Sequence, residues 1–344
     1  MPRELVHWEV AYRAVRRCAA ANPRSIAGIA ADNPGYLALG AVAHDAPYYF
    51  KAGADPFEAV GTLLHGRGGN DAGADPLALL DRFGALSTQL THEEARCAAL
   101  AFLVGLISHY ASDVAFHPFV FYATGDYYAP DPNARRQARA RHRLIEVYLD
   151  EHLRAMGTTF TWPDRIWTLI KECSPDSTAA ICRLLGEATA PFIDTTDPLR
   201  ATALDMTWWR SLKHMAYLQA SFLSPFLGAI AAGLNSISQQ RLYQYDCLFS
   251  RGRTGRYPPF DAPLHLKNPV TGDEDDTTFT ALLKRAEDGT VAWVEAIDRT
   301  QPAGGYREGT LHGGLSLNYG VLNAGPMAAT FFSPAPLPDK RTTR

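Results

Sequence analysis

Three polar residues recur at four-residue intervals in the otherwise mainly apolar stretch 103–119: His109, Asp113 and His117. At 3.6 residues per turn, such positions drift only about 40° around a helix axis, so their side chains project from one narrow stripe. Burying two imidazoles and a carboxylate together is costly unless a partner satisfies them, and a divalent metal ion is an economical partner. The spacing therefore predicts a metal-binding helix.

Other histidines and carboxylates have the types that the same ions need. His142 and Glu146 are four residues apart, which places an imidazole and a carboxylate within reach of one ion. Upstream, Asp45 follows a glycine-containing turn, His65 ends an expected helix, and His7 lies in the first helix. Three nitrogen or oxygen ligands and a water suffice for a catalytic zinc ion, so eight candidates indicate two or three ions. Lone histidines and i, i+4 pairs also decorate many exposed helices, so the central stripe carries the most weight.

Composition restricts the class of protein. A chain of 344 residues with 47% hydrophobic residues can bury a large core. The five cysteines are few, odd in number and not spaced as CxxC, so a metal here must use histidines and carboxylates. The net charge of −3 gives no electrostatic footprint for a nucleic acid, and we interpret the basic run at 135–143 as a solvated helix face. No specific nucleic-acid partner is expected.

Helical periodicity dominates the sequence and convincing period-two strands are scarce, which predicts an all-α multi-helix bundle. The metal-binding helix is expected to end near Pro118, where proline disfavours further helix. Glycine and proline predict loops at 66–75, 251–276 and 300–344, and hence a loop-rich C-terminal region. The expected helices cover residues 4–21, 56–66, 76–87, 92–116, 134–155, 164–172, 177–190, 198–234 and 277–298.

This pattern divides the chain into a metal-binding catalytic core over 1–155, further helices packing on it over 156–299, and an extended tail over 300–344. The longest apolar run, 216–234, is interrupted by polar residues and Pro225, so no transmembrane segment is expected. The aromatic-rich stretch 207–226 would instead allow peripheral contact with a membrane. The first fifteen residues lack a secretory signal, which favours a cytoplasmic location.

The ordered set of ligand types resembles the zinc-dependent phospholipase C family. The stretches "HWEVAYRAV", "GAVAHDAPYY" and "FLVGLISHYASDVAFHPF" look like that family's first helix, its Gly–Asp–Tyr turn and its central metal helix. The last stretch is also similar to glycosylphosphatidylinositol-specific phospholipase D, and "NPVTGDEDDTTFTALLKRA" is similar to a C-terminal segment of bacterial members. The likeness covers roughly residues 5–155. It implies the helical fold that this family shares with single-strand nucleases, and relatives are often secreted.

The resemblance implies a role for each candidate ligand. Asp45, His65, His109 and Asp113 would hold a first zinc ion, with Asp113 bridging to a second that His7 also binds. His117, His142 and Glu146 would hold a third ion. In relatives with three ions, an N-terminal tryptophan also chelates the second zinc, whereas no tryptophan precedes His7 in this sequence. That ion is then held differently, or the site binds two ions tightly.

The implied activity is hydrolysis of a phosphoric diester in a phospholipid by a zinc-activated hydroxide. The family likeness also makes Asp45 a candidate catalytic base. Aromatic stretches at 46–50 and 119–128 flank the ligands and offer rings for an apolar cleft or for cation–π contact with a choline head group. The expected substrate-binding residues are Tyr48, Tyr49, Phe119 and Tyr122.

Three other interpretations stay open at this point. The first is a single-strand nuclease, which would need stacking aromatics and a basic groove. The second is an HD-type phosphohydrolase, favoured if His44 faces the metal together with Asp45. The third is a helical binding protein whose zinc ions are structural and have a closed ligand shell.

Overall fold

The computed structural model describes residues 4–49, 57–66, 75–161, 165–193, 204–238, 249, 260, 263–301 and 304–334. Helices make up nearly all of the regular structure in these ranges, so the predicted all-α class is confirmed. The helices are α1 (Glu4–Ala21), α2 (Ile26–Asp32), α3 (Pro34–Ala43), α4 (Ala46–Tyr49), α5 (Phe57–Leu64), α6 (Ala78–Ser87), α7 (Glu93–Thr124), α8 (Pro132–Met156), α9 (Ile166–Glu172), α10 (Pro175–Thr189), η2 (Ala190–Phe192), α11 (Leu204–Phe222), α12 (Pro225–Ile237), α14 (Phe279–Thr300) and η5 (Pro326–Ala328). One antiparallel pair, β1 (Leu264–Lys267) and β2 (Glu274–Thr277), places Leu264 opposite Thr277.

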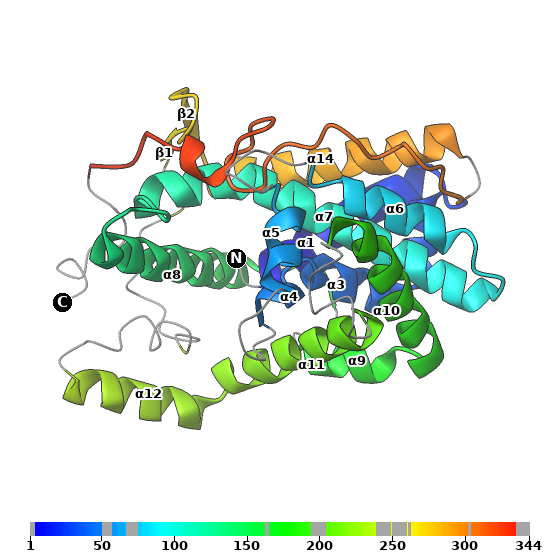
Figure 1. Ribbon diagram of the computed structural model, residues 1–344, viewed down its shortest axis with the longest axis horizontal. Helices are drawn as coiled ribbons and strands as arrows, with labels where there is room; N and C mark the ends of the chain where they lie inside the picture. The colour runs from blue at the N-terminus through cyan, green and yellow to red at the C-terminus, as the bar shows by residue number, and fades with distance from the viewer. Residues whose placement is uncertain are drawn as a thin grey trace.

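Helix α7 is the centre of the fold. It crosses the molecule along its long axis, and α3, α14, α2 and α1 pack around it (Figure 1). Almost every side chain from Ala98 to Thr124 is buried, as expected of a helix that is apolar on all sides. The hydroxyls of Ser108 and Ser112 donate to carbonyls of the preceding turn. The polar stripe of His109, Asp113 and His117 depends on other elements for its partners.

Two glycines allow α3 and α7 to pack at backbone distance. A Cβ on Gly40 would lie 2.1 Å from the carbonyl oxygen of Phe102, and a Cβ on Gly105 would lie 2.3 Å from that of Leu37. A side chain cannot occupy such a space in a close-packed interior, so this approach requires glycine. It brings the end of α3 and the turn after it next to the polar stripe of α7.

Helix α1 is held between α3 and α8. The indole Nε1 of Trp8 donates to the carbonyl of Ala38 on α3 at 2.9 Å. The carboxylate of Asp150 on α8 accepts hydrogen bonds from the backbone N–H groups of Leu5 (3.2 Å) and Val6 (3.1 Å). These N–H groups lie in the first turn of α1 and have no acceptor within the helix, so Asp150 caps it. The two anchors fix the position of His7.

The expected end of the metal-binding helix near Pro118 is wrong. Helix α7 continues through Pro118 to Thr124 and ends at Gly125, whose φ is 93°. Proline removes one backbone hydrogen bond, the one to the carbonyl of Val114. The buried aromatic side chains that follow, such as Phe119 and Phe121, keep the chain helical because their packing outweighs this loss.

Other element boundaries also differ from the expectation. The helix expected over 198–234 is two helices in the described residues, α11 and α12, bent by 73° where Ser224 and Pro225 start a new helix. The short helices α2, α3 and α4 escaped prediction because they are apolar on nearly all sides and show no 3.6-residue period. The loop expected over 251–276 contains β1 and all but the last residue of β2. Strand β1 is only four residues long, and β2 is acidic, so neither stands out as a strand in the sequence. Of the loop expected at 66–75, residues 67–74 lie outside the described residues.

Helices with membrane-like composition occur twice in the described ranges. Helix α7 is long and apolar enough to cross a membrane, but 94% of its apolar window is buried inside the protein. Helices α11 and α12 pass the same test only when joined across their bend. Helix α12 exposes several large apolar side chains, with Phe226 73% and Ile237 82% accessible. The expectation of no transmembrane segment stays a prediction.

The end of the described chain returns to the centre of the fold. Residues 304–322, here termed the C-terminal segment, contain no helix and a single isolated bridge, Leu315 with Leu322. They lie against α6 and α7 through hydrogen bonds to Asp81 and Tyr110. A loop-rich C-terminal region is therefore confirmed for these residues, while the division at residues 155 and 299 stays a prediction.

Candidate metal centre

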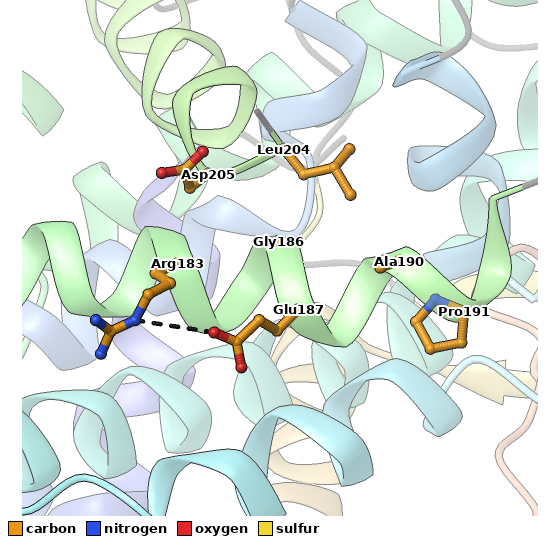
Figure 2. Close-up of a pocket in the computed structure, with 7 residues that line it drawn as sticks. All are labelled: Arg183, Gly186, Glu187, Ala190, Pro191, Leu204 and Asp205. Atoms are coloured by element: carbon orange, nitrogen blue, oxygen red, sulfur yellow. Dashed lines mark ion pairs between the residues drawn. The ribbon is translucent and has the colours of Figure 1, made fainter. Parts of the chain in front are cut away.

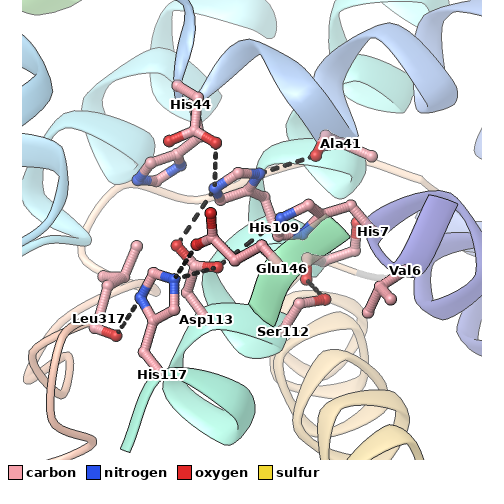
Figure 3. A network of polar contacts seen from close by, with 12 residues as sticks. Val6, His7, Ala41, His44, His109, Ser112, Asp113, His117, Glu146 and Leu317 are labelled. Atoms are coloured by element: carbon pink, nitrogen blue, oxygen red, sulfur yellow. Dashed lines mark hydrogen bonds and ion pairs between the residues drawn. The ribbon is translucent and has the colours of Figure 1, made fainter. Parts of the chain in front are cut away.

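Five parts of the chain bring the eight predicted ligands together. Helix α1 supplies His7, the turn between α3 and α4 supplies Asp45, and the residue after α5 is His65. Helix α7 contributes its polar stripe, and α8 contributes His142 and Glu146. All eight residues are buried, none of them more than 5% exposed. Figure 3 shows His7, His109, His117 and Glu146 converging around Asp113.

The cluster contains three groups of three residues, and within each group the ligand atoms lie within 4.8 Å of one another. The three groups are His7, Asp45 and His109; His65, His109 and Asp113; and His117, His142 and Glu146.

Asp113 lies at the middle of the cluster. Its Oδ2 atom is 3.3 Å from Nε2 of His109 and 3.7 Å from Nε2 of His65. Its Oδ1 atom is 3.5 Å from Nε2 of His117 and 3.7 Å from Nε2 of His7. One carboxylate therefore faces four imidazoles.

Two further carboxylates flank Asp113. The oxygens of Asp45 are 3.3 Å from Nε2 of His65 and 3.6 Å from Nε2 of His109. On the other side, Oε1 of Glu146 is 2.9 Å from Nε2 of His142 and 3.6 Å from Nε2 of His117. The cluster thus continues from Asp45 through Asp113 to Glu146.

Backbone carbonyls fix the orientation of three imidazoles. Nδ1 of His109 lies 2.8 Å from the carbonyl oxygen of Ala41, and Nδ1 of His117 lies 2.9 Å from that of Leu317. Nδ1 of His65 lies 2.7 Å from the carbonyl oxygen of Gly61. Because a carbonyl only accepts, each Nδ1 must be the protonated nitrogen, and in a neutral ring Nε2 then has a lone pair. Metal-binding histidines ordinarily make such a hydrogen bond from the ring nitrogen that does not bind the metal.

The unsatisfied atoms of the cluster fit a zinc centre. When Nε2 has a lone pair, it is a hydrogen-bond acceptor, and so is the carboxylate oxygen that faces it. Two buried acceptors repel each other unless a cation lies between them. Among the described residues, neither oxygen of Asp113 has a hydrogen-bond partner, and neither does Nε2 of His7 or His117. Two ligands of one tetrahedral zinc ion lie about 3.3–3.6 Å apart. Two of the four nitrogen–oxygen distances around Asp113, 3.3 and 3.5 Å, fall within that spacing, and the other two, both 3.7 Å, lie just beyond it.

Burial controls the protonation of the histidines. It lowers the pKa of His7, His117 and His142 well below the ordinary value, so these rings are neutral at neutral pH, the state in which an imidazole can bind a metal ion. Burial also opposes charge on His109, but Asp113 and Asp45 outweigh it and raise the pKa of that ring. Burial would raise the pKa of Asp45, whereas His109 and His65 lower it, so this carboxyl is ionised.

His44 does not join the three groups, although it precedes Asp45. Its Nε2 donates to the carbonyl of Leu64 at 2.9 Å, and its ring stacks on His109 with centroids 4.7 Å apart. It thus binds the backbone immediately before His65, while Asp45 contacts the ring of His65. This arrangement differs from the one that an HD-type phosphohydrolase requires.

The four predicted substrate-binding aromatics lie in different surroundings. The hydroxyl of Tyr48 is 3.2 Å from Nδ1 of His65, so it borders the cluster. Tyr49 is half-buried and its carbonyl accepts a hydrogen bond from His214. Phe119 is buried in the core against Phe260. Tyr122 is half-buried beside the core.

A separate pocket with a volume of about 550 Å³ opens between α10 and α11 (Figure 2). Among the described residues, its charged lining consists of Arg183 and Glu187, which pair at 3.9 Å, and Asp205. No histidine is among these described lining residues, so they lack the chemistry of the cluster. The remaining lining residues are Gly186, Ala190, Pro191 and Leu204.

Fold and cluster together define a helical protein with a buried metal centre of histidines and carboxylates. A family model described as zinc dependent phospholipase C matches residues 6–193, more than half of the 344-residue chain. The chain therefore belongs to the zinc-dependent phospholipase C family, a family of zinc hydrolases. All eight predicted ligands lie inside the matched region. No curated protein and no solved structure gives a match.

Several groups that support the cluster were not predicted from the sequence. The carbonyls of Ala41 and Leu317 have no signature in the sequence, because any residue has a carbonyl. Asp150 does have a signal: it follows Glu146 by four residues, on the same stripe of α8 as His142. His142, Glu146 and Asp150 therefore form a polar stripe on α8 that the sequence spacing indicates.

Proposed function

We propose that this protein hydrolyses the phosphodiester bond between a phospholipid head group and its diacylglycerol, with two or three zinc ions in the cluster. The single observation that carries the proposal is the position of Asp113, whose two oxygens face four imidazoles. A carboxylate in that position is suited to bridging neighbouring ions, and adjacent ions are suited to phosphodiester chemistry.

The proposed division of ligands follows two of the three groups. His65, His109 and Asp113 would hold one ion together with Asp45, whose oxygens lie within 3.6 Å of both rings. His117, His142 and Glu146 would hold another. His7, whose Nε2 lies 3.7 Å from Oδ1 of Asp113, would share that carboxylate for a further ion.

When bound, zinc ions supply an activated water and polarise a phosphoryl oxygen. The chain's own residues are proposed to contact the substrate and to accept a proton. Asp45 is ionised, and we propose that it accepts the proton of the attacking water as well as binding metal. Tyr48, beside His65, is proposed to contact the substrate at the edge of the cluster.

We also propose peripheral contact with a phospholipid surface through α12. This helix has no charged residue, and its exposed side chains Phe226, Ile230, Leu234 and Ile237 recur at intervals of three and four. At 13 residues it is too short to cross a bilayer, so it would lie along the surface. Replacing Phe226 and Ile230 by Asp should reduce binding to phosphatidylcholine vesicles while leaving hydrolysis of a soluble ester unchanged.

One experiment tests the substrate class. The zinc-loaded protein is incubated separately with a chromogenic phosphocholine ester, phosphatidylcholine vesicles, single-stranded DNA and a nucleotide. The proposal expects hydrolysis of the first two, and loss of it in His142→Gln. Cleavage of DNA or the nucleotide alone would identify a different phosphodiesterase. Zinc binding without hydrolysis of any substrate would favour a structural role for the ions.

A further inference from the structure

We propose that the C-terminal segment, residues 304–322, is a positioning element for the group formed by His117, His142 and Glu146, so that zinc binding there depends on its docking along α7. The segment lies outside the region matched by the family model, residues 6–193. The inference rests on the zinc-binding part of the proposed function and not on the phospholipid substrate.

Two carboxylates anchor the first half of the segment. Asp81 on α6 accepts hydrogen bonds from the hydroxyl of Tyr306 (2.6 Å) and from the N–H groups of Gly309 (2.8 Å) and Leu311 (2.9 Å). Asp75 accepts from the N–H groups of two adjacent glycines, 313 and 314, at 2.7 and 3.1 Å. Hydrogen bonds to ionised acceptors are the stronger kind, so the segment has a defined docking position.

The next residues run along α7 toward the polar stripe. The N–H of Leu315 donates to the hydroxyl of Tyr110 at 2.7 Å. A tight turn follows, in which the N–H of Ser316 donates to the carbonyl of Val321 at 2.9 Å. This turn directs the carbonyl of Leu317 at Nδ1 of His117, 2.9 Å away (Figure 3).

Gly320 makes the close approach of this turn feasible. Its φ is 63°, a conformation that other residues rarely adopt. A Cβ there would lie 3.0 Å from the carbonyl oxygen of Val114 and 3.3 Å from the Pro118 ring. The turn therefore packs against α7 beside Pro118, the residue that follows His117. Because Pro118 has no N–H, the carbonyl of Val114 lacks its usual helical hydrogen bond there.

The same turn supports His142 through aromatic packing. The ring of Tyr319 packs on Phe121 with centroids 5.1 Å apart, and Phe121 packs on His142 at 4.8 Å. Among the described residues, Nδ1 of His142 has no hydrogen-bond partner. Its orientation thus depends on rings such as Phe121 and Tyr127 rather than on a carbonyl. One short segment acts on both imidazoles of the group.

Removing the outer partner of a metal-bound histidine ordinarily weakens metal affinity about 10- to 100-fold. If docking of the segment strengthens zinc binding, zinc binding must strengthen docking by the same factor, because the coupling is reciprocal. The proposal can therefore be tested from both directions without any substrate.

The first test uses Asp81→Ala, with Gly320→Ala as a second variant that keeps both anchors. Zinc per chain and the dissociation constant of each ion are measured by titration of the metal-free protein. We expect one ion to bind about 10- to 100-fold more weakly in each variant and the others to be unaffected. The control is Arg17→Ala, which breaks ion pairs with Glu287 and Asp288 on α14, outside the segment, and should leave all zinc affinities unchanged.

The second test follows amide hydrogen exchange of peptides covering 304–322. Adding zinc to the metal-free protein should slow their exchange, and should not do so in His117→Ala. Lower thermal stability of Asp81→Ala and Gly320→Ala with unchanged affinity for every ion would overturn the proposal, as would zinc-independent exchange. Failure to hydrolyse phospholipid would count against the proposed function alone, because neither measurement includes a lipid.

Discussion

Asp113 follows His109 by one turn of α7, and its Oδ2 atom lies 3.3 Å from Nε2 of His109. The two side chains do not satisfy each other, because Nδ1 of His109 is committed to the carbonyl of Ala41. In the neutral ring, Nε2 therefore offers a lone pair to a buried carboxylate, and, although burial opposes charge on His109, the negative charge of Asp113 raises the pKa of that ring. The pair thus requires a positive charge between its two members, either a bound cation or a proton on His109.

Replacing Asp113 should remove more than one zinc ion. Its two oxygens face imidazoles that belong to different groups, so Asp113→Asn affects neighbouring ions together. Elemental analysis of purified protein gives zinc per chain. Glu146→Gln is the matched comparison, because Glu146 belongs to one group and should cost one ion. Equal losses in the two variants would show that Asp113 does not bridge.

The glycine contact between α3 and α7 should be among the most sensitive places in the fold. In Gly105→Ala, the new Cβ meets the carbonyl oxygen of Leu37 at 2.3 Å and the helices must separate. Overpacking of this kind typically lowers the free energy of unfolding by about 1–3 kcal/mol, measured by denaturant unfolding. Gly233→Ala is the control, because nothing lies within 4 Å of its Cβ and α12 should gain about 0.5–1 kcal/mol in helix preference. Similar effects at both positions would contradict the backbone contact.

Asp150 should affect zinc through α1. Asp150→Ala removes two hydrogen bonds to the first turn of the helix that carries His7, at a cost of about 1 kcal/mol. We also expect weaker binding of the ion that His7 holds, while Asp150→Asn, which keeps one acceptor oxygen, has an intermediate effect. Asp131→Ala removes a similar cap, at the start of α8, and should cost stability without changing zinc affinity. Unchanged zinc binding in Asp150→Ala would limit Asp150 to a structural role.

The metal-free protein should lose stability as the pH falls below about 6.5. Burial lowers the folded-state pKa of His7, His44, His117 and His142, so the unfolded chain binds more protons than the folded one in this range. His109, whose pKa is raised, acts in the opposite sense, but it is one ring against four. Thermal unfolding in a chelator between pH 7.5 and 5.5 measures the slope. His142→Gln should make the slope shallower, and a stability that rises on acidification would contradict the neutral state of these rings.

The sequence predicted which side chains lie together better than it predicted the elements that hold them. The stripe of His109, Asp113 and His117 can be recognised in the sequence because its members recur every four residues. All eight predicted ligands lie in one cluster. The carbonyl of Ala41 and the contact between Gly40 and Phe102 could not be predicted, because they depend on tertiary approach rather than on residue type. The same holds for the continuation of α7 through Pro118, where burial overrides local preference. The roles of the individual ligands stay predictions.

The hydrogen bond between His117 and Leu317 joins residues 200 positions apart in the chain. During synthesis, helices α1, α7 and α8 leave the ribosome well before residue 317 does. An early zinc ion would meet the first imidazoles while the outer support of His117 has yet to be made. If this group binds zinc as proposed, maturation has a built-in order, in which the group of His117 becomes competent only after residue 317 has been translated.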